Sequence, residues 1–156
     1  MIPEGIDGLT HINIYSKGRT PLGRWLTNFA YSPITIPEHG EFCSIEAFWY
    51  WLGCEHDSLR HLHGFAAKQM GKKILESRCD GLLYQRDNFE QLICSAIDIK
   101  LKSNLEMLYE LRDSTLPLVH YYEYGGKRID AGFEWITHHI ENRRQLLKEK
   151  WLVSCK

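Results

Sequence analysis

The alternation of apolar and polar residues near the start of the chain predicts extended segments. Ile12 and Ile14 alternate with polar neighbours over residues 10–16, which is the pattern of a half-buried strand. Residues 32–37 form a second short extended segment, because they include prolines, which are excluded from helix interiors and central strands. The residues between these segments, 17–24, are expected to form a loop. Two short strands are therefore predicted near the N-terminus.

The middle of the chain has the periodicity of helices. A helix is predicted over residues 45–52, because apolar residues recur there at helical spacing and Ser44 is a good N-cap. Gly53 is expected to end this helix. A second helix is predicted over residues 58–77, and residues 80–85 interrupt the pattern after it.

The rest of the chain combines long helices with a hairpin. Residues 89–112 predict a third helical region with a bend near Ser103. Residues 118–124 are rich in strand-forming side chains and end at the glycine pair 125–126, which is typical of a hairpin turn. A last helix is predicted over residues 133–151.

Length and composition change this picture little. The chain has 156 residues, the usual size of one domain, and its 44% hydrophobic and 25% charged residues exclude disordered and fibrous classes. We therefore predict an α+β fold, a single mainly helical domain with a few short strands. It is expected to span residues 1–156, with its core over about residues 10–147.

Charge and cysteine content narrow the function. The formal net charge of −1 excludes a general attraction to polyanions, so that any contact with nucleic acid has to be local. The five cysteines are odd in number and form no CxxC pair, which argues against a disulfide framework and a zinc ribbon. The histidine spacing is poor for a metal site. With no signal-peptide pattern or membrane-length apolar run, we expect a cytoplasmic protein without a metal.

Glu46 is the first candidate for chemistry. At helical spacing it falls at the border of the apolar stripe of residues 45–52, where a carboxylate would be partly desolvated. Desolvation raises a carboxyl pKa, which suits proton transfer or the binding of a sugar. The alternative is a first-turn glutamate that only complements the helix dipole.

Two lysines are further candidates. Lys68 is flanked on its predicted helix by small residues such as Ala67 and Gly71, which leaves its ammonium able to meet a phosphate or its amine to attack a carbonyl. The alternative is a solvated lysine on a tightly packed helix pair. Lys100 lies on an apolar stripe, where a lysine more commonly reaches solvent by snorkelling.

Several short motifs, in this order, resemble those of the NADAR (YbiA-like) family. They occur at residues 12–15 (INIY), 26–29 (LTNF), 42–47 (FCSIEA), 66–72 (AAKQMGK), 87–89 (DNF) and Lys100. The resemblance covers roughly residues 12–145. The chain departs from the family pattern at Asn88-Phe89, at Tyr124-Gly125-Gly126 and over residues 132–137, so the C-terminal wall of the pocket diverges.

The resemblance implies an α+β fold and N-glycosidase activity without metal or redox cofactor. The first implied reaction is the hydrolysis of the bond between ribose C1 and a base nitrogen, which removes ADP-ribose from a modified guanine base in nucleic acid. Such family members often stand near toxin or phage-defence systems. One alternative is the same reaction on phosphoribosyl intermediates of the riboflavin pathway, and another is a module that binds ADP-ribose or a related nucleotide without turnover.

The resemblance also implies roles for individual residues. Glu46 would hold the ribose hydroxyls or transfer protons, and Lys68 would engage the ribosyl carbon, with an imine as one route. The implied ligand-binding residues are Arg24 and Asn28 for a phosphate or ribose edge, Trp49, Tyr50 and Tyr124 for stacking on the base, and Lys100.

Overall fold

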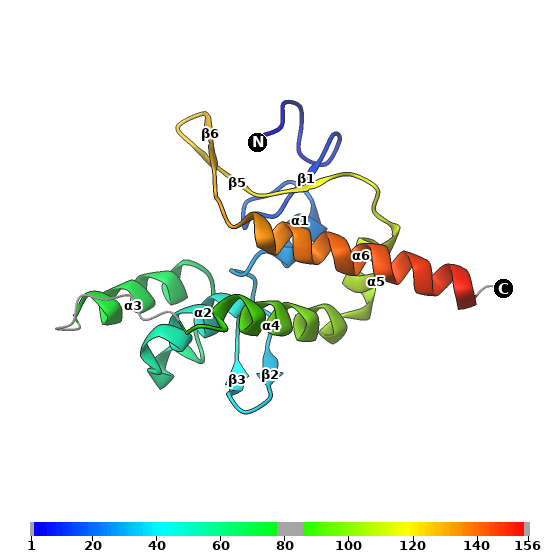
Figure 1. Cartoon of the computed structure of the whole chain (residues 1–156). Coiled ribbons are helices and arrows are strands. Elements are labelled where there is room, and N and C mark those ends of the chain that lie inside the picture. The colour runs from blue at the N-terminus through cyan, green and yellow to red at the C-terminus, as the bar shows by residue number, and fades with distance from the viewer. Residues whose placement is uncertain (1, 78–85, 155–156) are drawn as a thin grey trace. The chain divides into compact units, whose positions relative to one another are not determined.

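The computed structural model describes residues 2–77 and 86–154, and it confirms a mixture of helices and short strands (Figure 1). The predicted interruption over residues 80–85 lies outside the described residues. Backbone contacts divide the chain into two compact units. One unit is Asn28–Ser103, and the other combines Met1–Thr27 with Asn104–Lys156. The organisation of both units as one domain stays a prediction.

The unit Asn28–Ser103 is built from a hairpin and three helices. Its elements are β2 (Ile34–Ile36), β3 (Gly40–Phe42), α2 (Ile45–Cys54), the 3-10 turn η1 (Asp57–Leu59), α3 (Gly64–Glu76) and α4 (Phe89–Ser103). The two strands are antiparallel, with Ile34 opposite Phe42. Helix α2 packs against α3 and α4, and β2 packs against α4. Buried side chains such as Phe42, Phe48 and Ile93 form the core of this unit.

Helix α2 begins where the sequence predicts and ends later. Ser44 Oγ accepts a hydrogen bond from Ala47 N at 3.1 Å, which confirms the N-cap, and it donates one to Leu62 O at 3.0 Å. The predicted end at Gly53 is wrong. The helix continues to Cys54, and Glu55 closes it in the left-handed conformation (φ 51°) by donating its N–H to Trp51 O.

The predicted helix over residues 58–77 is wrong at its start. Residues Asp57–Leu59 form only a short 3-10 turn, and the helix proper begins at Gly64. His63 before it is extended, and Gly64 has a positive φ of 60°, a conformation that favours glycine. The stretch from Arg60 to His63 therefore forms a connection instead of a helical turn.

The second unit holds two strand pairs and three helices. Its elements are β1 (Ile12–Asn13), α1 (Pro21–Leu26), α5 (Leu105–Asp113), β4 (Leu118–Val119), β5 (Tyr121–Tyr124), β6 (Lys127–Asp130) and α6 (Glu134–Ser154). Strand β1 pairs with β4 in parallel, and β5 and β6 form the predicted hairpin through the glycine pair 125–126, both at positive φ. The predicted bend after Ser103 is a break at which Asn104 caps α5.

Two predictions for the N-terminal segment are wrong. The expected loop over residues 17–24 contains the start of α1, because Thr20 Oγ1 accepts from Gly23 N at 2.9 Å and Pro21 occupies the first turn. The segment 10–16 is not half-buried either. His11 and Asn13 are buried, since His11 Nε2 lies 2.8 Å from Tyr121 Oη and the Asn13 amide pairs with both backbone groups of Tyr121.

Candidate functional site

A turn at Asn28 and Phe29 joins the first residues of α2 and α3. Asn28 O accepts a hydrogen bond from Glu46 N at 3.0 Å, and Phe29 O accepts one from Gly64 N, also at 3.0 Å. The first N–H groups of a helix have no partner within the helix. The carbonyls of Asn28 and Phe29 therefore satisfy one such N–H group on α2 and one on α3. The turn therefore fixes the beginnings of both helices beside each other.

A close approach of α2 and α3 continues from this turn. The ring of Tyr50 on α2 packs directly on Gly71 of α3, where a Cβ atom would lie only 2.1 Å from Tyr50 Cγ. Glu46 lies one helical turn before Tyr50, and Lys68 lies about one turn before Gly71. The close contact between Gly71 and Tyr50 therefore brings Lys68 near the Glu46 carboxyl.

Glu46 is a buried carboxyl with a perturbed pKa. Its side chain is only 8% exposed. Burial raises the pKa of Glu46 to about 7, while the ammonium groups of Lys68 and Lys72 oppose this rise. The carboxyl can therefore gain or lose a proton near neutral pH, which is what a general acid or base requires. The desolvation predicted for this position is present.

The side chains of Phe29 and Asn28, in the turn that joins the two helices, add to the candidate site. The half-buried Lys68 has its Nζ 5.8 Å from the centroid of the Phe29 ring, which is a cation–π contact. Asn28 Oδ1 is shielded from solvent and accepts no hydrogen bond from the described residues. A buried acceptor of this kind is suited to an O–H or N–H group of a ligand.

The aromatic candidates of α2 are packed within the same unit. Trp49 is half-buried and meets the Phe89 ring edge-on, with centroids 4.7 Å apart. Tyr50 is half-buried against Gly71. Both rings have packing roles, and their stacking on a base stays a prediction.

Lys100 does not snorkel, contrary to the prediction. It lies on α4 and is only 2% exposed. Burial lowers the pKa of Lys100 to about 7. The Lys100 side chain is covered along its whole length, so its ammonium does not reach water. Its binding of a ligand stays a prediction.

Replacing Lys100 is expected to change how stability depends on pH. The unfolded chain holds the Lys100 proton up to about pH 10.5 and the folded chain only to about pH 7. The free energy of unfolding should therefore rise between these values, by up to about 1.4 kcal/mol per pH unit. Lys100→Met should remove this rise, whereas the exposed Lys102→Met should retain it. Urea unfolding over this range measures the slope, and equal slopes in the two variants would refute the burial of Lys100.

Two predicted ligand-binding residues belong to the other unit. Arg24 lies in the last turn of α1, not in a loop as expected, and its Nη1 donates to Gly18 O at 2.7 Å. Tyr124 is 80% exposed at the end of β5, next to the hairpin turn. Their participation in a site with Glu46 stays a prediction.

Sequence reasoning missed Lys72 and Phe29. Lys72 acts on the Glu46 carboxyl together with Lys68. Its position four residues after Lys68 places it on the same side of a helix, and this spacing was the available signal. The sequence shows Phe29 only as part of a motif, because its contact with Lys68 joins segments far apart in the sequence.

The described residues lack two features, a cluster of metal-ligating side chains and a membrane-spanning helix. Over residues 2–77 and 86–154, no group of three or more His, Cys, Asp or Glu side chains could hold a metal ion. Within the same ranges, no helix combines the length and the apolar character that crossing a bilayer requires.

Comparison with known proteins gives one structural relationship. No protein-family model and no curated protein matches the sequence. Among solved structures, the chain is similar to the NMR structure of the E. coli protein YbiA, with a TM-score of 0.66 and 18% sequence identity. The similarity covers 92% of this chain and 88% of that chain. It confirms the predicted α+β class and shows that the two chains share a fold.

Proposed function

We propose that the protein is an N-glycosidase of the NADAR (YbiA-like) family, which hydrolyses the bond between ribose C1 and a base nitrogen. Its substrate would be ADP-ribose attached to guanine in nucleic acid. The observation that carries the proposal is the buried Glu46 carboxyl, with a pKa of about 7, beside Lys68 and Lys72. The fold shared with YbiA and the ordered sequence motifs support the relationship to the family.

The chemistry of the reaction suits these groups. Cleavage of an N-glycosidic bond builds positive charge at the ribosyl carbon, and a carboxylate stabilises that charge. The departing nitrogen needs a proton, which a carboxyl with a pKa of about 7 can supply near neutral pH. In this role Glu46 either holds the ribose hydroxyls or transfers the proton. Asn28 Oδ1, which none of the described residues 2–77 and 86–154 pairs with, would accept a hydrogen bond from a ribose hydroxyl.

Lys68 offers a covalent route to the same products. Its neutral amine would attack C1, and the bond from C1 to the base nitrogen would break, with a proton passing to that nitrogen. Opening of the sugar ring then gives an imine between C1 and Lys68 Nζ. Water hydrolyses this imine, which releases the free sugar aldehyde and restores the amine. Direct attack of water at C1 is the alternative, and Lys68 would then only orient the substrate.

Chemical trapping separates the two routes. Incubation with substrate and borohydride is expected to reduce the imine to a stable secondary amine, which mass spectrometry would locate on Lys68. Lys72→Arg is a suitable comparison, because it removes the neighbouring lysine amine and keeps a positive charge beside Glu46. The adduct on Lys68 should persist in this variant. An adduct at Lys72, or none at Lys68 while turnover proceeds, would contradict the covalent route.

A panel of substrates tests the proposed activity. The protein would be incubated separately with a guanine-ADP-ribosylated oligonucleotide, with phosphoribosyl riboflavin-pathway intermediates and with free ADP-ribose. We expect release of ADP-ribose from the oligonucleotide. Cleavage of only the phosphoribosyl compounds would replace the proposed substrate. A rise in melting temperature with ADP-ribose but no cleavage of either substrate class would identify a binding module.

A further inference from the structure

We infer that one side of α3, formed by Phe65, Lys68 and Lys72 and termed the α3 flank, binds the nucleotides that adjoin the modified base in a single-stranded nucleic acid. The inference rests on the proposed function, because it extends the site of Glu46 along a neighbouring surface. Phe65 and Lys72 thereby gain a role in binding, and the substrate is a single strand with unpaired bases.

The geometry of the helix defines the α3 flank. Phe65, Lys68 and Lys72 are spaced i, i+3 and i+7, so that they lie along one side of α3. This side adjoins the buried stripe of Ala67 and Gly71, which contains the contact with α2. Both lysines act electrostatically on Glu46. The flank therefore leads from the candidate catalytic carboxyl toward the start of the helix.

Exposed aromatic rings stand at that end of the helix. Phe65 is 63% exposed and Tyr31 is 62% exposed. The Tyr31 ring lies edge-on to the ring of His63, with centroids 5.3 Å apart, directly before the first residue of α3. Exposed aromatic faces beside cationic side chains are the elements with which proteins bind single strands, because every base can stack on them.

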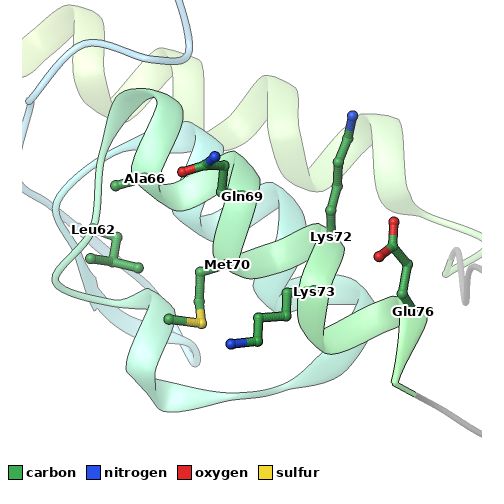
Figure 2. Close-up of a pocket in the computed structure, with 7 residues that line it drawn as sticks. All are labelled: Leu62, Ala66, Gln69, Met70, Lys72, Lys73 and Glu76. Carbon is green, nitrogen blue, oxygen red and sulfur yellow. The ribbon is translucent and has the colours of Figure 1, made fainter.

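The distribution of charge favours a short strand over a long duplex. Helix α3 carries three lysines, Lys68, Lys72 and Lys73, against one acidic residue, Glu76, which lies one turn after Lys72 on the same side, although the whole chain carries a net charge of −1. A duplex-binding protein usually has an extended basic surface, whereas a local cluster suits a few phosphates. Figure 2 shows the side chain of Lys72 pointing away from those of Met70 and Lys73, although all three line one hollow together with Leu62, Ala66, Gln69 and Glu76.

Binding of an unmodified single-stranded DNA of about ten nucleotides, followed by fluorescence anisotropy over a range of salt concentrations, tests the inference. Phe65→Ala is expected to weaken binding by about 5-fold to about 150-fold through loss of stacking. Lys72→Gln should weaken binding at low salt and should reduce the slope of log K against log salt by about 0.7, the contribution of one phosphate contact. Circular dichroism verifies that both variants are folded.

Matched variants of neighbouring residues outside the α3 flank serve as controls. Met70→Ala removes an exposed apolar side chain, and Lys73→Gln makes the same change of charge one residue beyond Lys72. Both are expected to bind within about two-fold of the unaltered protein, with Lys73→Gln keeping its salt slope. Equal losses in the control variants, equal affinity for duplex DNA, or no binding of the single strand would each overturn the inference.

The strand in this experiment carries no ADP-ribose, so its binding does not depend on turnover. Strand binding with the expected variant pattern would support the α3 flank even if no substrate of the panel were cleaved, and that result would reject the proposed activity alone. Cleavage of the modified oligonucleotide without measurable strand binding would reject the α3 flank alone.

Discussion

Glu46→Gln is expected to abolish turnover while making the folded protein more stable at neutral pH. Loss of a general acid or base reduces rates by about 100-fold to about 10,000-fold. The stability gain follows from the pKa of Glu46, which is 4.5 in a model compound and about 7 in the folded chain. Between pH 4.5 and about pH 7 the Glu46 carboxyl is ionised in the unfolded chain but still protonated in the folded chain. The free energy of unfolding therefore falls as pH rises through this range, by up to about 3 kcal/mol in total. Glutamine carries no such proton.

The measurement compares urea unfolding of both proteins across this pH range with their rates on the cleaved substrate. Glu90→Gln is a matched control, because Glu90 is also a first-turn glutamate, on α4, but it is exposed. It should leave both the rate and the pH dependence unaltered. A Glu46→Gln variant that is folded and fully active, or one whose stability difference stays constant with pH, would contradict the description of this carboxyl.

Gly71→Ala is expected to destabilise the protein by about 3 kcal/mol or more, the upper range for overpacking. The added Cβ would lie 2.1 Å from Cγ and 2.5 Å from Cβ of Tyr50, so that α2 and α3 have to move apart. On helix propensity alone the same change would stabilise an exposed helix by about 1 kcal/mol. Urea or thermal unfolding gives the difference, and a stability equal to that of the original protein would refute the close approach.

A double variant assigns the effect to this contact. Tyr50→Ala removes the ring that the new methyl group would meet. In Tyr50→Ala/Gly71→Ala the two losses should therefore not add, and the coupling should recover about 1 to 3 kcal/mol. Additive losses would mean that the methyl group at position 71 is not in conflict with the Tyr50 ring.

The elements that the sequence predicts well are those specified by local chemistry. Ser44 caps α2 through its own hydroxyl, and Asn104 separates α4 from α5 through its own amide. The glycine pair 125–126 adopts the positive φ that its hairpin requires. Each of these signals is contained within a few residues, so that a single sequence is sufficient to recognise it.

The failures concern residues whose environment comes from distant segments. The sequence position of Asn13 indicates an exposed polar residue, yet its amide is buried because it pairs with the backbone of Tyr121, 108 residues away. Lys100 is buried for the same kind of reason, since the residues that cover its helix stripe cannot be identified from the periodicity of the helix itself. Periodicity identifies a face of an element, but it does not identify the partner that covers that face.

The candidate site contains one feature that the local sequence predicts and one that depends on distant segments. The position of Glu46 at the border of the apolar stripe of its helix predicts a partly desolvated carboxyl, and its burial and raised pKa agree with this prediction. The proximity of Lys68 and Lys72 to that carboxyl required the packing of α2 on α3, which depends on Tyr50 and Gly71. The spacing of Lys72 from Lys68 places both on one side of a helix, but it does not show that this side faces Glu46.

The central claim is that the site around Glu46 cleaves the bond between ribose C1 and a base nitrogen. The most direct measurement is mass spectrometry of both products formed from a guanine-ADP-ribosylated single-stranded oligonucleotide by the unaltered protein and by Glu46→Gln. We predict intact free ADP-ribose and an unmodified oligonucleotide from the former and neither from the latter. Absence of cleavage by the unaltered protein, cleavage within the pyrophosphate instead, or equal yields from both proteins would contradict the claim.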